Sequence, residues 1–301
     1  MLFGNIEEYR ESARWTTFET NEIGYWHNFD VLTQNNTPHD DTTLVFLHGF
    51  PSASWDWHAQ WQELAKRHRC LAFDMLGFGL SDKPKHHKYS ILEQAKLCKH
   101  LCSKLNVKKV HIIAHDYGVS VAQQLLSEQE SGDTDLEITS ICFLNGGLFA
   151  DVHRPLFMQK VLHSWIGPVV SRFINKESFR ASFTKIFGDK TPPSAHEIDV
   201  LWGLLERKEG KYILHQLLRY LDDRITHGAQ WLGAMQATQV PMGFINGLDD
   251  PVSGAHMLEA FQQLLPNSPT AALPVGHYPQ LEAPEKVTEL LSLFLSQQRF
   301  K

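Results

Sequence analysis

The sequence predicts an α/β protein with a mostly parallel sheet flanked by helices, and with a helical cap inserted after the sixth strand. Two observations carry this prediction. Short apolar runs typical of buried strands alternate with amphipathic helical stretches up to residue 147, which is the pattern of a parallel sheet with helices on both faces. Residues 148–237 then hold few strand-like runs and show apolar residues at helical spacing, before the alternation resumes.

The first half of the chain contains six of the expected strands. Two of them form a hairpin of edge strands, and the other four are short apolar runs bounded by loops. Residues 35–41 are a loop by composition, and residues 74–84 form a glycine-rich loop that we expect Asp74 and Ser81 to hold in place. In chain order we expect the hairpin within 14–32, strands at 43–47, 70–73, 108–114 and 138–144, and helices over 55–64, 91–105 and from 119 onward.

The second half contains the expected insertion and the end of the sheet. Three apolar stripes at helical spacing run through residues 161–170, 198–205 and 213–221, and aromatic-rich helices inserted late in such a domain are typical of a lid. Strands at 240–246 and 270–273 and helices over 254–265 and 284–295 complete the chain. The expected domains are a core of residues 1–147 and 238–301 and a helical cap of residues 148–237.

Composition excludes several classes of function. The 301 residues are 43% hydrophobic and 21% charged, which is an ordinary globular profile. The formal net charge of −6 predicts neither nucleic acid nor an anionic membrane as partner. We find no apolar run of membrane-spanning length and no signal pattern at the N-terminus. We expect the four cysteines to be free thiols in a reducing cytoplasm, and no metal, nucleotide or redox cofactor is implied.

The chain is organised around His115-Asp116-Tyr117-Gly118, which lies between a strand ending at Ala114 and a helical stretch. A strand, a sharp turn and a helix in this order have the form of the nucleophile elbow, Gly-x-Ser-x-Gly. Ala114 occupies the first glycine position, where a small side chain suffices, and Asp116 occupies the serine position. Aspartate is also a common helix N-cap, so this residue alone leaves both interpretations open.

A carboxylate at an elbow suits a different reaction from a serine. Its attack on an ester or amide gives an unstable anhydride, whereas its attack on a saturated carbon gives an ordinary alkyl ester that water hydrolyses. Asp116 therefore points to epoxides, haloalkanes or strained lactones as substrates.

Other strand ends carry the groups that such a nucleophile needs. Asp249 and Asp250 follow the strand at 240–246, and His277 follows the strand at 270–273. The carboxyl ends of parallel strands meet at one edge of a sheet, and nucleophile, acid and histidine follow one another in the order of an α/β-hydrolase triad. After an early strand, the turn containing Phe50 is placed to supply a backbone N–H to the same site.

These motifs together resemble the α/β-hydrolase branch of epoxide hydrolases and haloalkane dehalogenases. A closer resemblance is to the mesoderm-specific transcript protein group, and it extends into the expected cap. The branch is matched at residues 48–51, 74–82, 115–118 and 276–277, and the group at 144–149, 153–155, 217–220 and 277–282. The resemblance implies an α/β-hydrolase fold over nearly the whole chain.

The resemblance also implies roles. Asp116 is the nucleophile, and His277 is the base that activates water. Asp250 orients His277, because the family places this acid three residues after a strand-end glycine, here Gly247. Asp249 is the alternative acid, and Asp151 is a third.

Backbone N–H groups of Phe50 and Tyr117 are implied as the oxyanion hole, which stabilises charge when water attacks the ester. Family members that open epoxides protonate the leaving oxygen with cap tyrosines. Tyr220 matches one such position, and Tyr212 is a weaker candidate. The second family tyrosine has no counterpart in residues 148–170, where His153 is a substitute to consider.

The resemblance favours hydrolysis of a small apolar epoxide to a diol. Dehalogenation is less favoured, because family dehalogenases commonly carry an indole where this chain has Tyr117 and Asn or Glu where it has Phe50. A strained β-lactone is a third substrate, and a non-catalytic binder on the same fold is a further alternative. Cap tryptophans that could still serve a halide are Trp165, Trp202 and Trp231.

Overall fold

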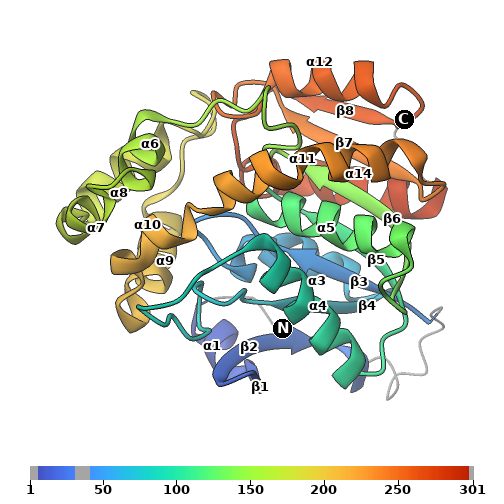
Figure 1. Ribbon diagram of the computed structural model, residues 1–301, viewed down its shortest axis with the longest axis horizontal. Coiled ribbons are helices and arrows are strands. Elements are labelled where there is room, and N and C mark those ends of the chain that lie inside the picture. Colours follow the sequence, from blue (N-terminus) through green and yellow to red (C-terminus); the bar gives the residue numbers. More distant parts are fainter. Residues whose placement is uncertain (1–5, 31–40, 298–301) are drawn as a thin grey trace.

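The computed structural model describes residues 6–30 and 41–297, and its centre is an eight-stranded sheet in the order β1-β2-β4-β3-β5-β6-β7-β8 (Figure 1). The β1–β2 and β2–β4 pairs are antiparallel, and the other pairs are parallel. The strands are β1 (Arg14–Phe18), β2 (Asn21–His27), β3 (Thr42–Leu47), β4 (Arg69–Phe73), β5 (Lys109–Ala114), β6 (Glu137–Leu144), β7 (Met242–Gly247) and β8 (Thr270–Leu273).

The central strands are apolar because both faces of the sheet are covered. All six residues of β7 are buried, as are the last three of β5 and the last five of β6, which is typical of a parallel sheet between helical layers. The helices of this part of the chain are α1 (Ile6–Glu11), η1 (Ser54–Trp57), α3 (His58–Leu64), α4 (Ile91–Lys104), α5 (Tyr117–Ser131), α12 (Ala255–Leu264), α13 (Pro279–Glu282) and α14 (Pro284–Gln297).

The segment between β6 and β7 is helical, and most of it lies to the left of the sheet in Figure 1. Its last helix returns across the molecule and packs along α5. The helices are α6 (Phe157–His163), α7 (Gly167–Val170), η2 (Ser171–Phe173), α8 (Lys176–Thr184), α9 (Ala195–Glu206), η3 (Arg207–Ile213), α10 (Leu214–Leu217) and α11 (Tyr220–Ala237). We call residues 148–237 the insertion; that they form a separate domain stays a prediction.

The fold class that the sequence predicts is confirmed. The expected hairpin is present: its two strands are antiparallel, and Arg14 pairs with Tyr25. In the glycine-rich loop, the Asp74 carboxylate accepts the Leu80 N–H at 2.7 Å, and the Ser81 hydroxyl donates to the Asp74 carbonyl at 2.6 Å. These two residues hold the loop as expected. Residues 35–40 of the expected loop at 35–41 lie outside the described residues.

One expected apolar stripe is not a buried face. The stripe through 161–170 is divided between α6 and α7, because Ser164 has extended backbone and a new helix begins at Gly167 with Pro168 in its first turn. Trp165 is 91% exposed and Val169 is 56% exposed. The stripe expected from the sequence therefore does not form one continuous buried helix face.

All four cysteines are buried and free, as the sequence predicts. Within the described ranges, the helices are too short or too polar to cross a bilayer.

Candidate active site

The turn between β5 and α5 places Asp116 in a strained backbone conformation. Its φ is +45° and its ψ is −101°, a region that non-glycine residues rarely adopt and that costs roughly 1–3 kcal/mol. Two close approaches hold it. A Cβ at Gly118 would lie 2.5 Å from the Leu47 carbonyl oxygen, and one at Gly146 would lie 2.9 Å from the Asp116 Cα. Asp116 occupies the N-cap position of α5, but its side chain makes no capping hydrogen bond to the helix, so capping does not account for the carboxylate.

The Asp116 carboxylate is buried and faces three donors. Its Oδ2 accepts the Phe50 N–H at 3.0 Å. Its Oδ1 lies 3.9 Å from His277 Nε2 and 3.7 Å from Arg224 Nη2. Burial raises the pKa of Asp116, but the charges of His277 and Arg224 lower it by more, so the net pKa is below its ordinary value. Asp116 is therefore an ionised carboxylate at neutral pH.

His277 is held by Asp250. The His277 Nδ1–H donates to Asp250 Oδ2 at 2.7 Å, and Asp250 also accepts hydrogen bonds from Asn145, Val252 and Ser253. Burial lowers the pKa of His277, but the charge and hydrogen bond of Asp250, together with the Asp116 charge, raise it to about 9. The imidazole is thus protonated at neutral pH while Asp116 is free.

The structure distinguishes the three candidate acids. Asp250 is buried against His277, whereas Asp249 and Asp151 are exposed. The backbone N–H of Asp249 donates to the Val275 carbonyl at 3.0 Å, and its side chain is exposed. Asn145 and Ser253, which sequence reasoning did not single out as site residues, complete the hydrogen bonds of the buried acid.

Phe50 and Tyr117 lie on either side of the nucleophile. The Phe50 N–H already contacts Asp116. Tyr117 begins α5, so its N–H belongs to the first turn, where backbone donors have no partner within the helix. Its ring is buried, 5.2 Å from Phe78 and 5.0 Å from Tyr220 between centroids.

Tyr220 is brought to the site by α11. Its ring centroid lies 6.1 Å from that of Phe50, and its buried hydroxyl makes no hydrogen bond of ordinary geometry with a described residue. Burial, and after it the Asp116 charge, raise the pKa of Tyr220 well above its ordinary value. Tyr220 is therefore a neutral hydroxyl with a proton to donate. Tyr212 instead lies beside Lys85 and Lys211, away from Asp116.

Arg224 is a site residue that sequence reasoning missed. Its Nη2 donates to the Asp116 carbonyl oxygen at 2.9 Å, and its Nε donates to the Ser120 hydroxyl at 2.8 Å. The guanidinium carbon lies 4.4 Å from the centroid of the Tyr220 ring. The available signal was the spacing of Tyr220 and Arg224, which are four residues apart and so share one face of a helix.

His153 also reaches the site. A Cβ built at Gly147 would lie 2.4 Å from Arg224 Nη1 and 2.9 Å from His153 Cδ2, so these two side chains meet over Gly147. Burial, followed by the Arg224 charge, lowers the pKa of His153 to about 3, so the neutral imidazole is favoured at physiological pH.

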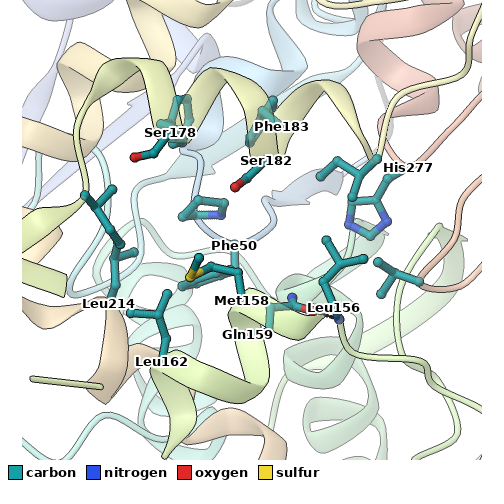
Figure 2. Close-up of a pocket in the computed structure, with 15 residues that line it drawn as sticks. Phe50, Leu156, Met158, Gln159, Leu162, Ser178, Ser182, Phe183, Leu214 and His277 are labelled. Carbon is teal, nitrogen blue, oxygen red and sulfur yellow. Dashed lines mark hydrogen bonds between the residues drawn. The ribbon is translucent and has the colours of Figure 1, made fainter. Parts of the chain in front are cut away.

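A cavity of about 110 Å³ leads to His277 (Figure 2). Helix α6 contributes Met158 and Leu162 to its wall, and α8 contributes Ser178, Ser182 and Phe183 from the opposite side. Leu214 lies at the end remote from His277. The wall is mostly apolar, so the cavity suits an apolar substrate.

The cap tryptophans do not line this cavity. Trp165 is exposed, Trp202 packs against Phe179, and the Trp231 indole N–H donates to Gln124 at 2.8 Å. Their expected use as halide donors is therefore not supported.

Known proteins are similar to this chain in sequence and in architecture. The family described as alpha/beta hydrolase fold matches residues 42–284. The mesoderm-specific transcript protein of Mus musculus is 35% identical over 288 residues, which cover 93% of this chain and 84% of that protein. LipZ of Mycobacterium tuberculosis is 36% identical over 290 residues, which cover 96% of this chain and 97% of that protein. The resemblance expected from the motifs is confirmed.

Solved structures of lower identity share the fold. The haloalkane dehalogenase DatA of Agrobacterium tumefaciens C58 superposes with a TM-score of 0.77 at 19% identity, over 95% of this chain and 96% of that one. The epoxide hydrolase CorEH gives a TM-score of 0.72 at 19% identity, over 94% and 98%. At this identity the likeness concerns the fold and not the substrate.

Proposed function

The chain belongs to the alpha/beta hydrolase fold family, and from this premise we propose that it is a hydrolase that opens epoxides to diols through a covalent ester on Asp116. One observation carries the proposal: the elbow holds a buried, ionised carboxylate, with the Phe50 N–H at 3.0 Å and the His277–Asp250 pair beside it. A carboxylate in this place is a nucleophile for saturated carbon.

The first step is alkylation of Asp116. A carboxylate oxygen attacks an epoxide carbon, the carbon–oxygen bond of the ring breaks, and the ring oxygen leaves as an alkoxide. Tyr220 donates a proton to this oxygen in the transition state, and a proton released by His277 restores the Tyr220 hydroxyl. His277 can release it because esterification removes the Asp116 charge that helps to hold the His277 pKa at about 9.

The second step is hydrolysis of the ester. Neutral His277 takes a proton from water, and the resulting hydroxide attacks the carbonyl carbon of Asp116. The negative charge on the carbonyl oxygen is stabilised by the N–H groups of Phe50 and Tyr117. When the ester bond breaks, the diol leaves and the site returns to ionised Asp116 with protonated His277, so one water molecule is consumed in each turnover.

The four buried free thiols support the cytoplasmic location expected from the sequence.

The mostly apolar wall of the cavity supports a small apolar substrate. A haloalkane is a weaker candidate, because it needs hydrogen-bond donors to a halide, and the cap tryptophans do not line the cavity. A lactone needs no such donor, so it remains in the substrate panel. The non-catalytic alternative conflicts with the strain at Asp116, which a binder has no reason to maintain.

Oxygen labelling tests the proposal directly. We expect a single turnover of the wild-type protein in heavy-oxygen water to place the label in the Asp116 carboxylate, found by mass spectrometry of its peptide. His277→Gln should accumulate the ester, visible as an adduct of intact mass. Label found only in the product of the first turnover would mean direct attack by water and would overturn the mechanism.

A panel of short epoxides, chloro- and bromoalkanes and β-lactones tests the substrate class. We expect diols from epoxides at the highest kcat/KM. Halide release without epoxide turnover would favour a dehalogenase, and no adduct from any substrate would favour the binder.

A further inference from the structure

Large apolar side chains are exposed together on one part of the insertion. Single exposed apolar residues are common on soluble proteins, but here they are concentrated within α6, α7 and η2, which pack against one another. We call residues 157–184, which run from α6 through α7 and η2 to α8, the tip, and Figure 1 shows these helices at the end of the molecule remote from the sheet. The exposed fractions are 79% for Phe157, 39% for Met158, 91% for Trp165, 56% for Val169 and 77% for Phe173.

The same part of the chain is basic, although the whole protein is acidic. Residues 153–190 have a formal charge of +5 in a chain of −6. Lys176 is paired with Asp199 at 2.8 Å, and Arg180 also acts on this carboxylate. Among the described acidic side chains, none forms an ion pair with Lys160 or Arg172. The segment contains Arg154, Lys160, Arg172, Lys176, Arg180, Lys185 and Lys190, against Glu177 and Asp189.

The cavity reaches this surface. Met158 belongs both to the exposed set and to the cavity wall, and Ser178 of α8 is a second wall residue that is exposed. Figure 2 shows α6 and α8 facing each other across the cavity, with His277 at one end. An apolar chain entering between these helices would therefore pass from the tip surface toward His277.

We propose that the tip docks on an anionic phospholipid bilayer, and that the protein takes from it an amphiphilic epoxide with an apolar chain. Aromatic side chains interspersed with lysine and arginine match an interface where acyl chains meet negative headgroups. The second half of this proposal rests on the proposed function, whereas docking does not. Net charge predicted no anionic membrane partner because it averages an acidic body with a basic tip.

Vesicle sedimentation tests docking without any turnover. We expect the wild-type protein to sediment with vesicles of phosphatidylcholine and phosphatidylglycerol, and much less with phosphatidylcholine alone or in high salt. The triple change Phe157→Gln, Trp165→Gln and Phe173→Gln should lower the partition coefficient by on the order of tenfold for each side chain. Trp15→Gln is the matched control, since Trp15 is an exposed tryptophan of β1, and it should change nothing.

A charge variant separates the electrostatic part. Lys160→Gln with Arg172→Gln should lower binding to the anionic vesicles about fivefold for each charge lost and should leave binding to phosphatidylcholine unchanged. Lys66→Gln, an exposed lysine beyond α3, is the control. Thermal unfolding should show that every variant is folded.

Turnover on two substrates separates this proposal from the proposed function. With a short, water-soluble epoxide, the triple variant should match the wild-type rate. With a long-chain alkyl epoxide held in anionic vesicles, its rate should fall in proportion to the lost binding. If neither epoxide is hydrolysed, the proposed function fails while vesicle binding still decides the docking.

Three results would overturn the docking proposal. The first is that the wild-type protein stays in the supernatant. The second is that the triple variant binds vesicles as well as the wild type does. The third is that the wild-type protein binds no vesicles but forms a concentration-dependent dimer, which the triple variant does not form. The last result would make the tip an interface between two copies of this chain.

Discussion

The active site lies between the carboxyl edge of the sheet and the insertion (residues 148–237). The polar groups that these two regions bring to the site differ in their hydrogen bonding. On the sheet side, the Asp250 carboxylate accepts hydrogen bonds from four residues, and Asp116 accepts the Phe50 N–H. On the insertion side, polar atoms near the nucleophile are buried and make no hydrogen bond of ordinary geometry with described residues. These atoms are the Tyr220 hydroxyl, Arg224 Nη1 and His153 Nε2.

This difference indicates a division of work. A buried polar atom without a partner costs about 1–3 kcal/mol. The Asp250 carboxylate already has its partners, whereas a bound substrate could supply partners to the three insertion atoms. We infer that the sheet determines the reaction and that the insertion determines which molecule undergoes it. Four predictions test this division, from the largest expected effect to the smallest.

The largest effect should come from the sheet side. Asp250→Asn removes the negative partner of His277, so imidazolium formation during ester hydrolysis loses its stabilisation, and turnover should fall by on the order of 10⁴. Stopped-flow measurement should show that ester hydrolysis slows more than ester formation. Asp249→Asn, the exposed neighbour, should retain nearly full activity; equal losses in the two variants would contradict the assignment of Asp250.

On the insertion side, Tyr220→Phe keeps the ring contacts with Tyr117 and Phe50 and removes only the hydroxyl. Epoxide opening should slow by on the order of 10³, within the range expected for a general acid. Single-turnover rates of ester formation measure this effect. A haloalkane needs no proton on its leaving group, so any haloalkane turnover should be nearly unchanged. An equal loss on both substrates would mean that Tyr220 acts through packing alone.

Arg224 tests whether the insertion also supports the nucleophile. Arg224→Met removes the charge that lowers the pKa of Asp116, so we expect ester formation to slow by on the order of 10². In the pH profile of ester formation, the fall of the rate at acidic pH should move to higher pH in this variant, because the pKa of Asp116 rises.

Arg224→Lys is the matched control, since it keeps the charge and loses the forked hydrogen bonds. In Arg224→Lys, the fall of the ester-formation rate at acidic pH should occur near the same pH as in the wild type, even if the rate itself is lower. A shared shift in both variants would attribute the effect to lost geometry rather than to charge.

The smallest effect concerns pH. Ester formation needs protonated His277 as the net proton source, so its rate constant should be level at neutral pH and fall about tenfold per unit above pH 9. Ester hydrolysis needs neutral His277, whose pKa is lower once Asp116 is esterified, so this step should instead rise with pH and level off below pH 9. Pre-steady-state measurement separates the two steps. An ester-formation rate that increases through pH 9 would exclude His277 as the proton source.

Much of the sheet side could be predicted from the sequence, because each of its site residues directly follows a strand that the sequence itself indicates. Asp116, Asp250 and His277 each follow a short apolar strand, and parallel strands end at one edge of a sheet. The alternation of strands and helices likewise predicts the fold class. The resemblance favoured Asp250 over Asp249, and only the fold shows that Asp250 lies against His277 while Asp249 is exposed.

The insertion depended on tertiary structure, because its helices meet the site from far away in the chain. Arg224 contacts Asp116 and Ser120 across more than a hundred residues, and its helical spacing alone does not distinguish a buried guanidinium from a solvated one. Trp165 looks like a core residue in the sequence and is 91% exposed, because burial depends on what packs against a face. The sequence by itself therefore determined the sheet and the residues at its edge, while only the packing of distant helices decided what surrounds them.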